Sequence, residues 1–251
     1  MGHDGGLRFI EFFGLPGCGK TTVAGALEHA LRARGYQVVS RRHALSDTGR
    51  APLRHVKRAR FVVVGLALAP GRFVRAARLI RAGRQASALR GAKVTWNLWC
   101  VMGWYLWERN RPARRRIAVV DQGLAQALWS IETSTGERTG AWRALLSDFG
   151  LDDVAFVHVR CEPALSRCRA QRRDAARRHL AGVRADEVGQ RGTEIVERID
   201  ENLQVLVGDG RSHRCSNDAH ADPRFVAGQL LGALLDRPLV EDVADPTSAW
   251  P

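Results

Sequence analysis

The sequence predicts an α/β fold of three layers, in which helices cover both faces of a parallel sheet. A strand, a glycine-rich turn, a helix and a second strand follow one another within residues 7–40. An apolar strand at 116–120 ends in an acidic residue, and strands alternate with helices again from residue 154. A strand–helix–strand unit of this kind requires parallel strands joined by a right-handed crossover, so these three observations together predict the sheet.

The first unit begins with residues 7–13, which are rich in aromatic and aliphatic side chains, as is typical of a buried strand. A helix is expected from about Lys20 to Arg34, because its apolar residues recur on one face, and Gly35 ends it. Residues 36–40 form the second short strand.

About seventy residues then separate the second strand from the next one, and their pattern is helical. Helices are expected at 52–69, 72–85 and 88–109, with Pro70-Gly71 ending the first, so that a helical insertion occupies about 50–112. The third helix carries four tryptophans and has apolar residues all round, which predicts that it is mostly buried. A hydrophobic acceptor pocket, or a face for a partner or a membrane, is the alternative for these tryptophans: Trp96, Trp99, Trp104 and Trp107.

The second half of the chain alternates strands and helices. The expected elements are a strand at 116–120, a short helix at 124–130, a polar loop at 132–140, a helix at 141–149, a strand at 154–159, a helix from Pro163, a helix at 193–207, a weak strand at 213–216 and a closing helix at 223–235. The whole is expected to form a single domain over 1–237, followed by a flexible tail at 238–251.

The charge balance favours anionic ligands. The chain has 39 Lys and Arg against 26 Asp and Glu, and nearly all the cations are arginines. Arginine matches phosphate geometry, although codon bias accounts for part of such an excess. No recognisable nucleic-acid-binding motif is present, which argues against a nucleic-acid partner. Five cysteines without metal-ligand spacing, and no signal peptide, lead us to expect a reduced, cytoplasmic location.

The strongest motif follows the first strand: Gly14-Leu15-Pro16-Gly17-Cys18-Gly19-Lys20-Thr21, with Thr22 after it. Its glycines let the backbone curl so that successive N–H groups face phosphate oxygens, and the N-terminus of the next helix adds positive charge. Lys20 can reach the phosphates, and the Thr21 hydroxyl can ligate Mg²⁺. The motif lies between a strand and a helix, so it predicts a P-loop NTPase fold that binds the triphosphate of ATP or GTP with Mg²⁺.

Asp121 is the second candidate. It stands at the end of an apolar strand about a hundred residues after the glycine-rich motif, as a Walker-B acid does. We expect it to hold the metal shell, to accept the acceptor's proton, or both. The alternative is that it caps the following helix.

With these motifs the sequence resembles the P-loop kinases of the nucleoside and nucleotide kinase superfamily, most closely the thymidylate-kinase-like branch. The run from Phe9 into Thr22 resembles the opening of that branch, and Asp121 stands where the branch has its Asp-Arg pair. The resemblance implies an arginine-rich LID at about 167–190, in which Arg169 and Arg173 would close over the phosphates.

The acceptor side departs from that branch. Arg41 and Arg42 follow the second strand, where the branch has an arginine, but no Arg-Glu-Pro run follows. Gln122 replaces the arginine that would contact an acceptor phosphate. A neutral side chain cannot offset a phosphate dianion, so we expect an acceptor that is bulkier or more apolar than a nucleoside monophosphate.

The sequence therefore predicts an ATP- and Mg²⁺-dependent kinase for a small-molecule acceptor. Its expected catalytic residues are Lys20, Asp121, Arg41, Arg42, Arg169 and Arg173. A nucleotide-driven ATPase or GTPase switch that regulates a partner, and a true nucleoside monophosphate kinase, stay open as alternatives. Peripheral membrane contact stays open, since two apolar stretches are flanked by arginines. A homodimer also stays open.

Overall fold

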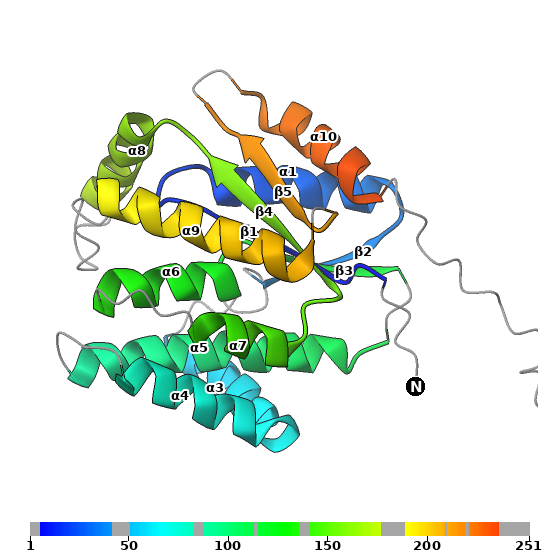
Figure 1. Cartoon of the computed structure of the whole chain (residues 1–251). Helices are drawn as coiled ribbons and strands as arrows, with labels where there is room; N and C mark the ends of the chain where they lie inside the picture. Colours follow the sequence, from blue (N-terminus) through cyan, green and yellow to red (C-terminus); the bar gives the residue numbers. More distant parts are fainter. Residues whose placement is uncertain are drawn as a thin grey trace, which may run out of the picture.

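The computed structural model describes residues 6–41, 51–82, 88–112, 115–135, 141–176, 189–208, 210–218 and 221–235. Its five described strands form one parallel sheet in the order β2-β3-β1-β4-β5 (Figure 1). They are β1 (Phe9–Phe13), β2 (Gln37–Ser40), β3 (Arg116–Val120), β4 (Val154–Arg160) and β5 (Ser212–Ser216). β1 is central and pairs with both β3 and β4, so the loop after β1 opens between the carboxyl ends of those strands, where α/β sheets place their ligands.

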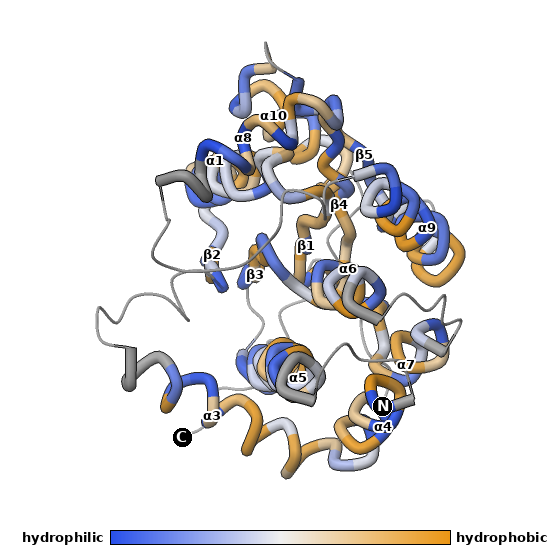
Figure 2. Tube along the Cα trace, turned by 90° about the vertical axis from the view of Figure 1, so that its left-hand side faces the viewer, coloured by the Kyte–Doolittle hydropathy of each residue, from blue (hydrophilic) through white to orange (hydrophobic). Residues whose placement is uncertain are grey.

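Helices cover both faces of the sheet, as predicted. One face is covered by α1 (Lys20–Ala33) and α10 (Pro223–Leu235). The other face is covered by α5 (Ala88–Arg109), α6 (Leu124–Thr135) and α9 (Gln190–Val207). Further from the sheet on this side lie α3 (Ala51–Leu68), α4 (Pro70–Ala82) and α7 (Ala141–Phe149) (Figures 1 and 2). The remaining helix, α8 (Pro163–Ala176), contacts the loop after β1.

Alternation along β1 explains the two cores. Phe9 and Phe13 face α5 and α6, whereas Ile10 and Phe12 face α1 and α10, because successive strand residues point to opposite faces. All five residues of β1 are buried, so the strand that supports the glycine-rich loop is enclosed on both sides.

The insertion packs onto the sheet through α5. Trp104 and Tyr105 are fully buried, and the Tyr105 ring stacks on Phe9 with centroids 4.6 Å apart. Trp96, Trp99 and Trp107 are half-buried. The prediction of a mostly buried tryptophan-rich helix is therefore confirmed for its central residues.

Two expected boundaries were wrong. α3 ends before Pro70 as expected, but α4 begins at Pro70 and not at Arg72, because a proline at the first position of a helix lacks only an N–H that would have no partner there. The polar loop expected from Glu132 is helical through Thr135, because the Glu132 carboxylate is buried and pairs with Arg198 of α9. Segment 238–251 lies outside the described residues. None of the helices that the structure describes is long and apolar enough to span a membrane.

Candidate phosphate-binding site

The glycine-rich loop joins β1 to α1 and takes a backbone path that only glycine adopts easily. Gly14, Gly17 and Gly19 have φ angles of 144°, 90° and 91°. L-residues avoid this region because of clashes involving Cβ. The loop ends at the N-terminus of α1, whose first N–H groups have no acceptor within the helix. The local structure is therefore that of an anion-binding loop.

Two neighbouring segments hold this loop tightly. A Cβ added to Gly17 would lie 2.2 Å from the carbonyl oxygen of Ser166, and one added to Gly19 would lie 1.9 Å from Asn217 Nδ2. The Ser166 hydroxyl donates to the carbonyl of Pro16 at 2.7 Å, and Asn217 Nδ2 donates to the carbonyl of Cys18 at 2.8 Å. The loop is thus clamped between α8 and the residue that follows β5.

Lys20 directs its ammonium back over the loop. Nζ donates to the carbonyls of Gly14 and Leu15, both at 2.8 Å, and the residue is only 8% exposed. These carbonyls fix the cation beside the loop's backbone. The ammonium is therefore held next to the backbone that would bind an anion, and it can exchange these carbonyls for the anion's oxygens.

Thr21 and Asp121 are brought together from two different elements. The Thr21 hydroxyl, in the first turn of α1, donates to Asp121 Oδ2 at 3.1 Å, at the end of β3. Neighbouring ligands of an octahedral Mg²⁺ with bonds of about 2.0–2.1 Å lie about 2.9 Å apart. The two oxygens therefore fit adjacent positions of one Mg²⁺ shell with little movement. Thr22 follows with an exposed side chain.

Arg41 lies near this oxygen pair. Its Nη1 donates to the carbonyl of Gln122, directly after Asp121. Its Nε is buried and has no hydrogen-bond partner among the described residues. Burial lowers the pKa of Arg41, while the charges of Tyr105, Asp121 and Glu11 oppose that shift. The guanidinium is thus anchored on one side and retains donor capacity on another.

Of the other residues predicted for the site, the structure places Arg169 beside the loop, but it does not describe the side chains of Arg173 and Arg42. Arg169, on α8, donates from Nη1 to the carbonyl of Asn217 at 3.3 Å, which puts it beside Gly19. Arg173 lies in α8, but its side chain is outside what the structure describes, as are Arg42 and residues 177–188. The Gln122 side chain is exposed.

Glu11 was not predicted as a functional residue, yet it organises the turn after β3. Its side chain is fully buried and accepts from the Tyr105 hydroxyl at 2.5 Å and from the backbone N–H groups of Leu124 and Ala125 at 2.8 and 2.6 Å. Burial raises its pKa, and these three donors and the Arg41 charge oppose the shift. The carboxylate thereby caps α6 and fixes the backbone that carries Asp121. A lone acid inside an apolar strand is the sequence signal that points to it.

A second cluster of metal-ligand types lies between β4 and α9. Ligand atoms of His158, Glu197 and Asp200 lie within 4.8 Å of one another. However, Arg160 pairs with Glu197 at 2.6 Å and Arg214 with Asp200 at 2.6 Å. Because guanidinium groups already neutralise both carboxylates, we assign this cluster to structure and not to metal binding.

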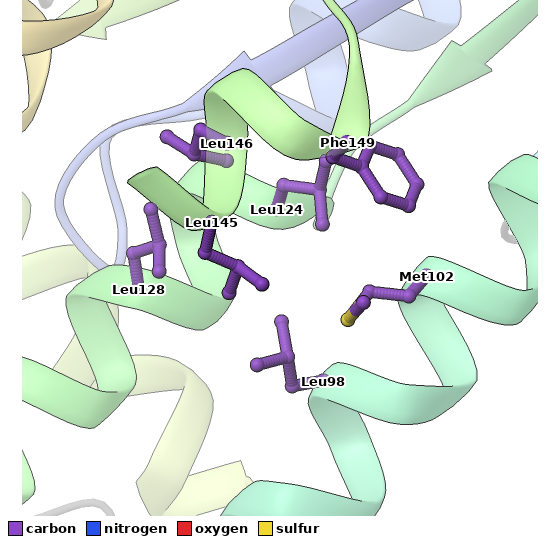
Figure 3. A pocket seen from close by; sticks show the side chains of 7 residues that line it. All are labelled: Leu98, Met102, Leu124, Leu128, Leu145, Leu146 and Phe149. Atoms are coloured by element: carbon purple, nitrogen blue, oxygen red, sulfur yellow. The ribbon is translucent and has the colours of Figure 1, made fainter. Parts of the chain in front are cut away.

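An apolar cavity lies where α5, α6 and α7 meet (Figure 3). Its volume is about 10 Å³, and only apolar side chains line it, among them Leu98, Met102, Leu128 and Phe149. A space of this size holds no more than a single water, and its lining offers that water no hydrogen bond. The cavity therefore does not serve as an acceptor pocket.

Comparisons with known proteins add little about function. No family model matches the chain, and no curated protein matches it. Among solved structures, the chain is similar to a gluconokinase from Sinorhizobium meliloti 1021 at 16% sequence identity, over 90% of this chain and 91% of that one. The TM-score is 0.37, a level at which the similarity says nothing of the reaction.

Proposed function

We propose that this protein is a phosphotransferase that moves the γ-phosphoryl group of ATP to a hydroxyl of a small-molecule acceptor, with Mg²⁺. The observation that carries the proposal is the convergence of the Lys20 ammonium and the Thr21–Asp121 oxygen pair on one glycine-rich loop. A cation, a pair of hard oxygen ligands and an anion-binding loop are the parts that phosphoryl transfer requires. The resemblance to the thymidylate-kinase-like branch stays a prediction.

The residues divide the chemistry among themselves. Backbone N–H groups of the loop bind the phosphates, and Lys20 turns from the loop carbonyls toward the β- and γ-phosphate oxygens. Thr21 and Asp121 would hold Mg²⁺, which when bound would supply positive charge against the triphosphate. The acceptor oxygen forms a bond to the γ-phosphorus as the bond to the β,γ-bridging oxygen breaks, and ADP leaves. The hydroxyl proton passes to Asp121, directly or through water.

Arg41 and Arg169 supply further positive charge in this proposal. Arg41 is held next to Asp121 by the Gln122 carbonyl, so its free donor capacity can serve the acceptor or the transferred group. Arg169 is held beside Gly19, on the opposite side of the loop from β3, so it can serve the nucleotide. The neutral, exposed Gln122 supports an acceptor other than a nucleoside monophosphate.

The test is an ADP-release assay over a panel of sugars, nucleosides, nucleoside monophosphates, antibiotics and lipid-linked alcohols, with mass spectrometry of the product. We expect acceptor-dependent ADP release and a product heavier by one phosphoryl group. Lys20→Ala should abolish transfer while the protein stays folded, whereas Lys93→Ala, an exposed lysine of α5, should leave it unchanged. ADP release that no acceptor stimulates would favour the ATPase or switch alternative. Unchanged turnover in folded Lys20→Ala would refute the proposed site.

A further inference from the structure

The excess of positive charge is concentrated in one part of the chain. Residues 48–107 contain twelve Lys and Arg and no Asp or Glu, out of 39 basic and 26 acidic residues in the chain. The rest of the chain is therefore nearly balanced in charge. This acid-free segment comprises α3, α4 and most of α5, so the charge belongs to the insertion and not to the phosphate-binding layer.

The same helices expose aliphatic side chains. Val56, Val63 and Leu68 on α3 and Val74 on α4 are 66%, 64%, 51% and 46% exposed, and only two other large apolar residues in the described parts of the chain are exposed to this degree. Val56 and Val63 are seven residues apart, two helical turns, so they lie on one face of α3. Leu68 lies about 140° further round α3 and close to its end, where α4 begins. We name these four exposed residues, Val56, Val63, Leu68 and Val74, the α3–α4 patch.

The patch lies on the outer side of the molecule. α3 uses its inner face to bury Phe61 and Val62 towards α5. Figures 1 and 2 show α3 and α4 on the far side of α5 from the sheet. Lys57 and Arg60 are exposed on α3 between and beside the valines, and the Arg60 guanidinium lies 4.3 Å from the centroid of the Trp107 ring. Aliphatic groups rimmed by cations thus form the outermost surface of the insertion.

We propose that the α3–α4 patch binds the surface of an anionic lipid bilayer, with α3 lying in the plane of the interface. Helices that do this insert aliphatic side chains among the acyl chains while Lys and Arg meet anionic headgroups. The proposal does not depend on the phosphotransferase activity, because it uses a different face of the molecule.

Other occupants fit the patch less well. In a symmetric dimer the same surface faces itself, so a second copy would place the exposed cations Lys57 and Arg60 of one molecule close to those of the other. Single-stranded nucleic acid would need aromatic rings for stacking, and the exposed residues of the patch are aliphatic. Protein hot spots are rich in Trp and Tyr, which this patch also lacks. Aliphatic groups with surrounding cations match the chemistry of an anionic membrane.

Co-sedimentation of the full chain with vesicles tests the proposal. We expect binding to vesicles of phosphatidylcholine with about 30% phosphatidylglycerol, little binding to pure phosphatidylcholine, and weaker binding at high salt. Val63→Asp should lower the fraction bound to anionic vesicles about fivefold or more, since it opposes both the apolar and the electrostatic contribution. Val205→Asp is the matched control, because Val205 is 70% exposed on α9, outside the patch. Circular dichroism checks that both variants are folded.

Six outcomes would overturn the proposal. Equal binding to neutral and anionic vesicles would show that the patch does not recognise anionic headgroups. No binding to either kind of vesicle would show that the protein does not bind membranes. Val63→Asp that binds like the wild type, or Val205→Asp that loses as much, would place the contact elsewhere. A concentration-dependent dimer in sedimentation, lost in Val63→Asp while vesicle binding is kept, would reassign the patch to self-association. Val63-dependent binding of transfer RNA without vesicle binding would reassign it to nucleic acid.

Discussion

If the oxygens of Thr21 and Asp121 hold Mg²⁺, replacing Asp121 should change how activity depends on the metal. Asp121→Asn keeps the shape of the side chain but removes the charge that a hard cation prefers. We expect the Mg²⁺ concentration for half-maximal activity to rise about tenfold, and kcat to fall about 100-fold, as when one electrostatic contact of a transition state is lost. ATP binding should weaken less. Titrating Mg²⁺ in the ADP-release assay measures the half-maximal Mg²⁺ concentration and kcat. Asp152→Asn, which changes an exposed acid after Leu151, is the control. A wild-type Mg²⁺ curve for Asp121→Asn would show that Asp121 does not hold the metal.

Because Glu11 accepts three buried hydrogen bonds, its loss should lower the stability of the protein. Glu11→Ala leaves the Leu124 and Ala125 N–H groups and the Tyr105 hydroxyl without their acceptor inside the protein. Unsatisfied buried donors cost about 1–3 kcal/mol each, so we expect urea unfolding to show a loss of about 3 kcal/mol or more. Tyr105→Phe removes one donor and keeps the ring, and should cost about 1–2 kcal/mol. A loss below about 0.5 kcal/mol for Glu11→Ala would contradict this account.

Some residues of the site could be predicted from the sequence, and others could not. Lys20, Thr21 and Asp121 were predictable, because short motifs and a strand end place them whatever the rest of the chain does. Ser166 and Asn217 were not, since each meets the loop from about 150 and 200 residues away in the chain. Their positions depend on how α8 and β5 pack, and the sequence contains no local signal for that.

Among the elements, α9 is tied to the sheet by Asp200. Its carboxylate contacts His158 of β4 at 3.1 Å and Arg214 of β5 at 2.6 Å, and the residue is fully buried. Burial opposes ionisation of Asp200, but hydrogen bonds and charge from His158 and Arg214 outweigh it, so its pKa lies below the usual value of 3.8. Its contribution to folding is therefore complete above pH 3.8 and is lost as the pH falls through the lower folded value.

Asp200→Asn should remove this contribution. We expect the unfolding free energy at pH 7 to fall by about 3 kcal/mol, since one partner of a buried ion pair is lost. The difference between wild type and variant should shrink as the pH drops below about 4, where the wild-type carboxylate takes up its proton. Denaturant unfolding from pH 7 to pH 3 measures it, with Glu201→Gln, at an exposed acid next in the chain, as control. A difference that is constant over this range would argue against the ionised carboxylate as the anchor.

Element boundaries were predictable where local chemistry sets them. The helices at 88–109, 141–149 and 223–235 were expected with the bounds that the structure has, because glycine, proline or a change of apolar period marks their ends. α6 was expected to end five residues too early, since its last turn consists of polar residues. The buried contact of Glu132 with Arg198, a tertiary interaction, stabilises this last turn.

For the whole molecule, the two cores on either side of the sheet predict a single cooperative unfolding transition. The core on the α5 side includes residues of both the insertion and β1, among them Phe9, Trp104 and Tyr105. The core on the other side shares β1 through Ile10 and Phe12. The described part of the insertion thus shares one core with β1, and β1 contributes to both cores.

The tryptophans make this testable, because the six in the described segments all lie on α5, α6 and α7. Leu27 belongs to the core on the opposite face of the sheet from those helices, yet we expect Leu27→Ala to lower the midpoint of tryptophan fluorescence as much as that of far-ultraviolet circular dichroism. The cost should be about 2–5 kcal/mol, as for other buried leucines. Leu98→Ala, on α5, should shift both signals together in the same way. If Leu27→Ala lowered the dichroism midpoint and left the fluorescence midpoint in place, the insertion would unfold by itself and would be a separate domain.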